Sequence, residues 1–403
     1  MSILFGHPTG NPNSHNAAMA YLEAGLLECF CVAWMPSTKT IDTLKRFRPL
    51  RLLAQRLERR IFPPLSHVPK VQTRAREFSR LAIRAAGLTE YRITNQIDRW
   101  LMRTMARECQ RSTVTAVHAY EDCSLWQFIE AKRLGKACIY DMPTCYYPEW
   151  ERIRVKLCRT YSDWFPSQES SVAHSIRLEQ KQREMTLADL TLVASRYVEA
   201  TIREFYPHKH IARIPYGVDA EFWTPRPGNK QPGPLRFIYA GYISVRKGVP
   251  LLIEAWSKAE LRDAELALVG PWELADSKRG SLPRGIRWFP ACSPRALRDW
   301  YRESDVFVFP SYSDGFGLAV LEAMACGLPA IASEASIGPE IVTASCGFTS
   351  PPGDLDRLVE LLSWFDRNRD ELPSMSREAR TRAMRCTWNS YRSLVTGAVS
   401  KLV

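Results

Sequence analysis

Two acidic side chains eight positions apart, Asp314 and Glu322, are the first candidates for chemistry in this sequence. They lie in the stretch SYSDGFGLAVLEAMACG (311–327), where glycines break the loop after Asp314 and Glu322 interrupts an apolar run. An ionised carboxylate in an apolar wall is costly unless it faces a wet cleft and finds polar partners. Glu322 is therefore either a ligand-binding acid or a side chain that merely offsets a helix dipole. Taken alone, the acid pair favours the second interpretation.

The residues around the two acids predict the elements that position them. VFVFP (306–310) is typical of a buried strand, and LAVLEAMAC (318–326) is typical of a helix that ends at Gly327. The two glycines of the connecting loop let the backbone approach a ligand. The first-turn N–H groups of such a helix form an anion site that suits a diphosphate.

Both halves of the chain alternate short apolar runs with longer amphipathic ones, as strand–helix units do. The expected strands are 113–120, with His118 at its carboxyl end, 136–143, 235–241, 264–270, 305–311 and 328–333, and helices are expected over about 14–27 and 249–259. This alternation predicts an α/β protein with two doubly wound, Rossmann-like parallel-sheet domains. The stretch TPRPGNKQPGP (224–234) has the composition of a linker between them. Ligands bind at the carboxyl ends of such sheets, so we expect a cleft between the domains.

Length and composition narrow the class of protein. A chain of 403 residues exceeds the usual single core, and 45% hydrophobic with 24% charged residues is ordinary for a globular protein. The first residues, MSILFGHPTG, lack a signal-peptide pattern, and no apolar run approaches the roughly 18 residues of a membrane span. Eleven scattered cysteines, with only Cys29 and Cys31 close together, indicate free thiols in a reducing cytosol and not a zinc site.

The net charge of +12 is concentrated in one segment. Residues 45–84 carry twelve Lys or Arg against two Glu, which leaves only +2 for the rest of the chain. Leucines and an isoleucine recur there at near-helical spacing between arginines (Leu50, Leu53, Leu57, Ile61). This pattern fits a basic amphipathic helix on an anionic membrane or against an anionic substrate, and equally a core-facing stripe with a solvated basic face. Nucleic acid is disfavoured, because no interleaved aromatics or binding motif accompany the charge.

Longer stretches of the chain resemble one enzyme family. SDGFGLAVLEAMACGLPAIAS (313–333) resembles the acid-x7-acid signature of retaining glycosyltransferases with the GT-B fold, in particular family 4, the bacterial-type "glycosyl transferases group 1". IPYGVDAEFWTP (214–225), FIYAGYISVRKGVPLLIEAW (237–256) and TLADLTLVASRYV (186–198) are similar to further units of that family. The resemblance implies an acceptor-side domain over 1–215, a linker over 216–234 and a nucleotide-sugar-binding domain over 235–384. It also implies a terminal helix over 385–403 that packs back on the first domain, with Trp388 and Tyr391 in the core.

The resemblance also implies roles for residues around the acid pair. Glu322 is implied to bind the ribose hydroxyls of a nucleotide-sugar donor, and Asp314 to lie beside the transferred sugar as a catalytic residue. Backbone amides that follow Asp314 are implied to hold the sugar and diphosphate (Gly315, Phe316, Gly317 and Leu318). The family usually has Glu at the first acidic position, so Asp314 is a departure that predicts a different sugar pose.

Further residues are implied on both sides of the cleft. Lys247 in GYISVRKG (241–248) matches the family lysine that contacts the leaving diphosphate, and Gly241 matches the first glycine of that motif. Tyr242 replaces the usual companion arginine, and we expect Arg246 to supply the second cation. Standing alone, Arg246 and Lys247 would instead fit an exposed basic turn. His118 matches a histidine that meets the donor sugar, although a lone histidine is more often structural.

The first loop of the N-terminal half contributes weaker candidates. Gly10 and Asn11 are implied on the donor, and Asn13 and His15 on the acceptor side, together with Asp122. Glu121 and Asp141 are expected near the cleft, where solvation or turn capping would also account for them. Glu340 follows SIGP (336–339), where capping of the next helix is favoured over ligand contact.

These expectations combine into one predicted function with two alternatives. The predicted enzyme is a retaining, metal-independent glycosyltransferase of cell-surface polysaccharide or lipopolysaccharide synthesis, in which a nucleotide diphosphate-sugar is a substrate and there is no cofactor. A glycan or lipid-linked glycan would be the acceptor. The expected location is the cytoplasm, with peripheral attachment of residues 45–84 to the membrane. The alternatives are a nucleotide-sugar epimerase and a non-catalytic nucleotide-sugar-binding protein on the same fold.

Overall fold

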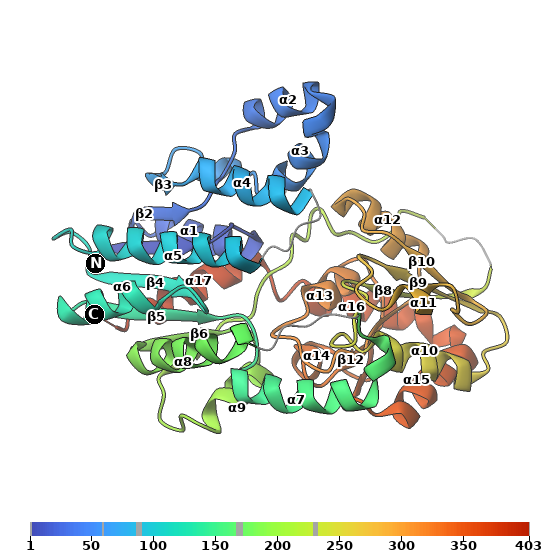
Figure 1. The fold of residues 1–403 in the computed structure, drawn as a ribbon. Coiled ribbons are helices and arrows are strands. Elements are labelled where there is room, and N and C mark those ends of the chain that lie inside the picture. The colour runs from blue at the N-terminus through green and yellow to red at the C-terminus, as the bar shows by residue number, and fades with distance from the viewer. Residues whose placement is uncertain (1, 59, 86–90, 167–171, 229–232, 403) are drawn as a thin grey trace.

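The computed structural model describes residues 2–58, 60–85, 91–166, 172–228 and 233–402. Two sheets form the two lobes of Figure 1, and every strand pair in both of them is parallel. The strand orders are β3-β2-β1-β4-β5-β6-β7 and β10-β9-β8-β11-β12-β13. In both sheets the order reverses beside the first strand, as it does in doubly wound folds. The predicted α/β class is confirmed.

The N-terminal lobe contains the first sheet and most of the helices that cover it. Its strands are β1 (Ile3–His7), β2 (Leu27–Val32), β3 (Lys70–Gln72), β4 (Ala116–Tyr120), β5 (Ala137–Met142), β6 (Leu190–Val193) and β7 (Ile211–Arg213). Its helices are α1 (Pro12–Glu23), α2 (Thr38–Arg46), α3 (Arg51–Glu58), α4 (Arg74–Ala85), α5 (Tyr91–Glu108), α6 (Leu125–Arg133), α7 (Tyr147–Thr160), α8 (Val172–Leu187) and α9 (Arg196–Arg203), with 3-10 turns η1 (Arg48–Leu50), η2 (Pro63–Leu65) and η3 (Ser162–Trp164).

The C-terminal lobe contains the second sheet. Its strands are β8 (Leu235–Ala240), β9 (Ala264–Val269), β10 (Ile286–Phe289), β11 (Val306–Phe309), β12 (Ala330–Ser333) and β13 (Gly347–Ser350). Its helices are α10 (Val249–Ala259), α11 (Asp276–Arg279), α12 (Pro294–Glu303), α13 (Leu318–Ala325), α14 (Gly338–Ile341), α15 (Leu355–Arg367) and α16 (Leu372–Ala383), with the 3-10 turn η4 (Arg369–Glu371). The last helix, α17 (Trp388–Val399), lies against α1 of the N-terminal lobe (Figure 1).

Burial explains why the central strands read as continuous apolar runs. β11 (VFVF) and β12 (AIAS) are buried at every position, because helices cover both faces of the sheet. β4 (AVHAY) is buried throughout in the same way. Helix α17 is tied to α1 by Arg392, which donates hydrogen bonds to Glu23 Oε2 and Asn16 Oδ1, both at 2.9 Å. The buried ring of Tyr391 packs on the ring of Tyr216, with the two ring centroids 5.7 Å apart.

Three details differ from the sequence-based expectations. Helix α1 begins at Pro12 and not near Ser14, because Asn11 caps it through a reciprocal pair of bonds with Ser14. The strand β4 ends at Tyr120, so His118 lies in its middle and not at its end. The leucine stripe of the basic segment faces protein: Leu57 is buried in a small cluster with Trp34 and neighbours, so the core-facing alternative holds for it.

The segment of residues 34–85 forms a separate layer of helices α2, α3 and α4 at one end of the N-terminal lobe (Figure 1). Its only fully buried acid, Glu77, is held between Arg60 and Arg80, each 2.7 Å from Glu77 Oε1. Within the residues that the structure covers, no helix combines the length and the apolar character needed to cross a membrane. All eleven cysteines are free thiols.

Candidate active site

The loop between β11 and α13 carries Asp314, and the helix that follows carries Glu322. Gly317 occupies the N-cap position with φ 90°, a left-handed conformation that favours glycine. Among the described residues no side chain caps this helix; the Val320 N–H donates to the Gly317 carbonyl at 2.9 Å, which leaves the Leu318 and Ala319 N–H groups for water or a ligand. Leu318 and Ala319, the first two helical residues, are only partly buried. This end of α13 can therefore receive an anion, as predicted for a diphosphate.

Lys247 and Asp314 form an ion pair across two loops of the C-terminal lobe. Their side chains are 12% and 16% exposed. Burial acts to raise the pKa of Asp314, but the Lys247 ammonium and the Arg246 guanidinium together hold it below its ordinary value. Burial lowers the pKa of Lys247, and Asp314 partly offsets this change. The acid is thus ionised at neutral pH, and its negative charge favours the protonated form of the lysine.

Arg246 lies close to the same ion pair, and its role as a second cation for the donor stays a prediction. Its Nη1 donates a hydrogen bond to the carbonyl of Ser313, 2.8 Å away. Tyr242, which replaces the usual family arginine, is 46% exposed and points away from the core, while its carbonyl accepts a 2.7 Å bond from the Tyr239 hydroxyl. Gly241 is exposed at the carboxyl end of β8 with φ 146°.

Glu322 lies one turn into α13 and is half-buried. Burial raises the pKa of its carboxyl group to about 8. Among the described residues, no hydrogen bond or ion pair to the Glu322 side chain is present, in contrast to Asp314. A half-buried acid without a protein partner is costly, and ligand hydroxyl groups would lower that cost.

The amides predicted to hold the donor fall into two groups. Gly317 and Leu318 lie at the open end of α13, whereas the Phe316 N–H already donates to Asp314 Oδ1, 3.1 Å away. Gly315 lies against the other lobe: a Cβ there would be 1.6 Å from the carbonyl oxygen of Pro143. The glycine at 315 is therefore required by an interdomain contact, which replaces ligand approach as the reason for it.

The first-loop candidates lie together at the carboxyl end of β1. The Gly10 N–H donates to His7 Nδ1 at 2.8 Å. The side-chain oxygen of Asn11 accepts a hydrogen bond from the Ser14 N–H, because Asn11 caps α1. His15 is buried, stacks on Phe62 with centroids 5.0 Å apart, and leaves its Nε2 without a partner in the described chain. Burial and the nearby Arg60 lower the pKa of His15 to about 4, so the ring is neutral at physiological pH.

Two cavities adjoin these candidates. One, of about 440 Å³, is lined by Phe62, by the segment 34–37 that follows β2, by β3 and by the start of α2; His15 does not line it but stacks on Phe62. The other, of about 430 Å³, lies between α7 of the N-terminal lobe and the loop that contains Arg246, with Trp150 and Glu273 in its wall. Both have room for a sugar-sized group. Asn13 adjoins the buried Tyr216 hydroxyl.

His118 is placed differently from the expectation. Its side chain is 0% exposed, its Nδ1 is 2.7 Å from the Tyr21 hydroxyl, and its ring packs edge-on to Phe5 at 4.9 Å. The predicted position at the strand end is wrong, because β4 extends two residues further. Asp141, 3.6 Å from His118 Nε2, is buried with it and does not reach the cleft surface. The implied contact with a donor sugar stays a prediction.

Glu121 and Asp122 belong to a partly buried polar network, and a role of Asp122 on the acceptor side stays a prediction. Lys181 approaches both, at 2.5 Å from Glu121 Oε1 and 3.3 Å from Asp122 Oδ2. Asp122 has a left-handed backbone, φ 70°, and its N–H donates to Glu184 Oε2 at 3.0 Å. The loop that follows β5 contacts this network through the Thr144 hydroxyl, which donates to Glu121 Oε2 at 2.7 Å.

The sequence-based reasoning missed the residues that join the two lobes at this loop. Ser195 Oγ donates to the Gly315 carbonyl at 2.6 Å, and the Tyr197 hydroxyl donates to Ser313 Oγ at 3.0 Å. Ser313 Oγ in turn donates to Cys145 Sγ at 3.1 Å. No local sequence pattern predicts these contacts, because the partners are more than one hundred residues apart in the chain.

Glu340 also acts between the lobes. Its Oε1 accepts a 2.8 Å hydrogen bond from the Arg196 N–H at the start of α9, and its Oε2 is 3.6 Å from Arg213. It caps a helix, as favoured from sequence, but the helix belongs to the other lobe. In the ranges that the structure covers, no group of three or more His, Cys, Asp or Glu side chains is arranged to hold a metal.

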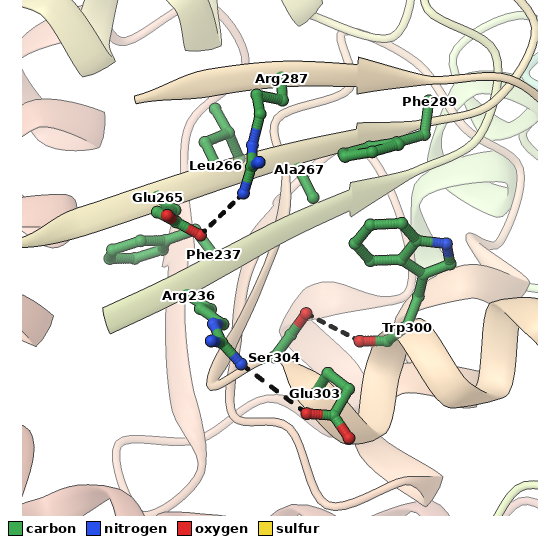
Figure 2. Close-up of a pocket in the computed structure, with 10 residues that line it drawn as sticks. All are labelled: Arg236, Phe237, Glu265, Leu266, Ala267, Arg287, Phe289, Trp300, Glu303 and Ser304. Carbon is green, nitrogen blue, oxygen red and sulfur yellow. Dashed lines mark hydrogen bonds and ion pairs between the residues drawn. The ribbon is translucent and has the colours of Figure 1, made fainter. Parts of the chain in front are cut away.

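A further pocket lies away from the acid pair. Figure 2 shows this cavity of about 150 Å³ between β8, β9, β10 and α12. Its charged side chains pair with one another, Arg287 with Glu265 at 3.2 Å and Arg236 with Glu303 at 3.7 Å. Arg236 and Glu265 are each the second residue of a strand, so the pocket lies near the amino ends of the sheet. It is not part of the candidate site.

Comparisons with known proteins agree with this geometry, beginning with the class of fold. Along its whole length the chain is similar in structure to sucrose-phosphate synthase from Thermosynechococcus elongatus (TM-score 0.66, 16% identity, 100% and 99% of the two chains). It is also similar to Anabaena HepE solved with UDP-glucose (TM-score 0.63, 15% identity, 100% of both chains). The fold is GT-B, as predicted.

The match to a family model lies almost entirely in the C-terminal lobe. Residues 223–382 match the profile of the family described as "Glycosyl transferases group 1". Over 192 residues the chain is 30% identical to the sulfoquinovosyl transferase SQD2 of Arabidopsis thaliana, a match that covers 43% of this chain. The chain spans only 36% of that relative's own length.

Proposed function

We propose that this protein transfers a sugar from a nucleotide diphosphate-sugar to a hydroxyl acceptor, with retention at the anomeric carbon. The observation that carries the proposal is Glu322, a half-buried acid with its pKa raised to about 8 and with no protein partner among the described residues. It lies one turn from the uncapped start of α13 and on the same unit as Asp314. A nucleotide supplies both missing partners, ribose hydroxyls for the acid and a diphosphate for the helix end.

The hardest step of such a transfer is departure of the diphosphate from the sugar. Lys247 and Arg246 can offset the negative charge that develops on the leaving group, and so can the N–H groups at the start of α13. Asp314 holds Lys247 in a fixed position before the donor binds. Preorganised charge of this kind needs no protein nucleophile, which is consistent with front-face transfer.

In the proposed reaction the bond between the anomeric carbon and the phosphate oxygen breaks while a bond to the acceptor oxygen forms on the same face. The acceptor proton passes to the departing phosphate oxygen, so atoms and charge balance. The side chains Lys247 and Arg246 provide the cations, and we propose that transfer needs no divalent metal. Addition of EDTA is therefore expected to leave the rate unchanged, and a rate restored only by Mg²⁺ or Mn²⁺ would contradict this part.

The proposed donor class is supported by the family profile match and by the solved HepE structure, which contains UDP-glucose. A glycan or a lipid-linked glycan of cell-surface polysaccharide or lipopolysaccharide synthesis is the proposed acceptor. The cavity lined by Phe62 is the proposed entry for the acceptor, because Phe62 stacks on His15 and the cavity wall has both aromatic and hydroxyl side chains.

The test is a panel of UDP-, GDP- and ADP-sugars incubated with the protein, with and without extracted glycan or lipid acceptors. Release of nucleoside diphosphate that depends on the acceptor, with the sugar recovered on the acceptor in the same anomeric configuration, is the expected result. Interconversion of sugars without acceptor would indicate an epimerase instead. Nucleotide-sugar binding with no turnover under any condition would indicate a binding protein.

We also propose that the α2–α3 layer attaches the protein to an anionic membrane surface on the cytoplasmic side. Phe47 is 59% exposed between the exposed Arg46 and Arg48, and Arg51 is exposed one turn further on. An exposed aromatic ring among arginines suits the boundary between lipid headgroups and acyl chains. Sedimentation with phosphatidylglycerol vesicles should pull down the wild type at low salt and release it at high salt. The matched variant combines Phe47→Ser with Arg46→Ser and Arg48→Ser. Sedimentation of this triple variant equal to that of the wild type would contradict the proposal.

A further inference from the structure

A short loop of the N-terminal lobe is pressed against the loop that carries Asp314. A Cβ added to Gly315 would lie only 1.6 Å from the Pro143 carbonyl oxygen, so the two backbones are in direct contact. On the other side of Asp314, Ser313 Oγ donates to Cys145 Sγ at 3.1 Å. Both neighbours of Asp314 in the chain are therefore held by residues 143–145. The position of the acid depends on the position of that loop.

Thr144, in the centre of the same loop, is anchored to the body of the N-terminal lobe. Its hydroxyl donates to Glu121 Oε2 at 2.7 Å, and Lys181 Nζ lies 2.5 Å from Glu121 Oε1. The Glu121 and Lys181 side chains are only 8% and 16% exposed. Burial acts to lower the pKa of Lys181, but the Glu121 and Asp122 carboxylates raise it above its ordinary value. The lysine thus stays charged and bound to Glu121.

The turn that carries Glu121 is itself rigidly held. Glu184 accepts hydrogen bonds from the Ser124 N–H at 2.9 Å and the Leu125 N–H at 3.1 Å, at the start of α6. No side chain of α6 caps that end, so Glu184 replaces the cap. Lys181 and Glu184 are both on α8, about one turn apart. One helix therefore fixes the Glu121 side chain and the backbone next to it.

A buried ion pair is weak support for net stability, because desolvation of the two charges opposes their attraction. Its clearer effect is to select one arrangement of the groups around it. Here a chain of contacts connects Lys181 on α8 to Glu121 and Glu121 to Thr144. The loop that contains Thr144 in turn contacts the residues on both sides of Asp314.

We propose that Glu121 and Lys181 are positioning residues for Asp314, acting through Thr144 across the domain boundary. They do not touch the substrate; they keep residues 143–145 seated on the Asp314 loop. This inference rests on the proposed function for its kinetic test, and a second test is independent of activity.

The kinetic test compares Glu121→Gln and Thr144→Val with the wild type and with Thr144→Ser, which keeps the hydroxyl. Glu121→Gln is expected to lower kcat about tenfold and Thr144→Val three- to tenfold, while KM for the donor stays within twofold. Thr144→Ser is expected to retain wild-type kcat. The matched control is Asp189→Asn, because Asp189 pairs with Lys132 at 2.5 Å and accepts from the Cys138 N–H at 2.8 Å, at the amino end of β5. This variant should lower Tm without a change in kcat.

Wild-type kcat in both Glu121→Gln and Thr144→Val would overturn the inference. So would a loss of kcat in Asp189→Asn that follows the same dependence on Tm, because the effect would then be general destabilisation. A wild type that transfers no sugar would contradict the proposed function and not the positioning role, which the second test addresses.

The second test uses Ser313→Cys, which places a thiol opposite Cys145. Oxidation with diamide should form a 145–313 disulfide, identified by mass spectrometry of the linked peptides. Adding Thr144→Val or Glu121→Gln should slow this cross-link several-fold, whereas Thr144→Ser or Asp189→Asn should not. Equal cross-linking rates in all of these backgrounds would overturn the inference whether or not the protein is an enzyme.

Discussion

Lys247 and Asp314 are paired in the half-buried space between two loops of the C-terminal lobe, and the pair places a fixed cation beside the start of α13. The Asp314 carboxylate favours the protonated form of Lys247, because burial alone would lower the lysine pKa further.

Lys247→Met should lower kcat about a hundredfold or more, the usual effect of removing one group that stabilises a developing negative charge. Nucleotide affinity should change only a few-fold, since Glu322 and the helix end remain. Steady-state kinetics and calorimetric titration with the nucleoside diphosphate check this. Lys258→Met is the control, because Lys258 is 54% exposed on α10 and pairs only with Glu254. A loss of affinity without a loss of kcat would assign Lys247 to ground-state binding.

Glu322→Gln should change the pH dependence of stability. The pKa of about 8 in the folded protein lies above that of the unfolded chain, so the folded state retains a proton that the unfolded state has lost. Stability is therefore lost as pH rises from about 4.5 to 8. The variant should have a higher Tm than the wild type at pH 8.5, and the two should converge near pH 5. A lower Tm of the variant at every pH would show that Glu322 has a structural partner.

The pH dependence of nucleotide affinity should also report the ionisation of Glu322. Ligand hydroxyls that donate to Glu322 favour its ionised form, so wild-type affinity should increase between pH 6.5 and 8.5. Glu322→Gln should bind more weakly and show no such increase. Fluorescence titration at several pH values measures this, and an identical pH profile in the two proteins would exclude Glu322 as a ribose ligand.

Gly315→Ala should separate the two lobes at the loop beside Asp314. The new methyl group would collide with the Pro143 carbonyl, and backbone on both sides leaves no flexible side chain to move. We expect kcat to fall at least tenfold and protease cleavage between the lobes to accelerate. Gly397→Ala in α17 is the control, since its Cβ meets nothing within 4 Å. That change should leave activity intact and stabilise by about 0.5–1 kcal/mol.

His118→Leu should act on stability and not on turnover. The variant leaves the buried Tyr21 hydroxyl without its hydrogen-bond partner, which should lower the free energy of unfolding by about 1–3 kcal/mol. Any loss of total activity should then follow the loss of folded protein. Thermal unfolding and kcat measured per folded molecule check this. Tyr21→Phe removes the same hydrogen bond and should behave alike. A hundredfold loss of kcat with unchanged Tm would instead support the family-implied contact with the donor sugar.

Local patterns were sufficient for the strands that are buried on both faces and for the unit that carries the two acids. β11, α10 and α13 lie within a residue or two of their predicted bounds, because apolar runs and glycine ends encode them locally. Short edge strands such as β3 and β7 have no distinct pattern, since pairing with a neighbour forms them. Helix α1 starts two residues earlier and ends four residues earlier than expected, and β4 starts at Ala116 and ends two residues beyond His118. Asn11 is therefore the cap of α1, and His118 lies inside the strand.

The sequence by itself determined the α/β class and the spacing of Asp314 and Glu322 around a helix start, because these properties depend on residues close in the chain. Only the tertiary structure decided which charges meet. It paired Lys247 with Asp314, left Glu322 without a partner among the described residues, and set Gly315 against Pro143. Lys247 and Asp314 meet because they follow neighbouring strands of one sheet, β8 and β11, although they are 67 positions apart in the chain. Gly315 and Pro143 meet because the two lobes pack against each other.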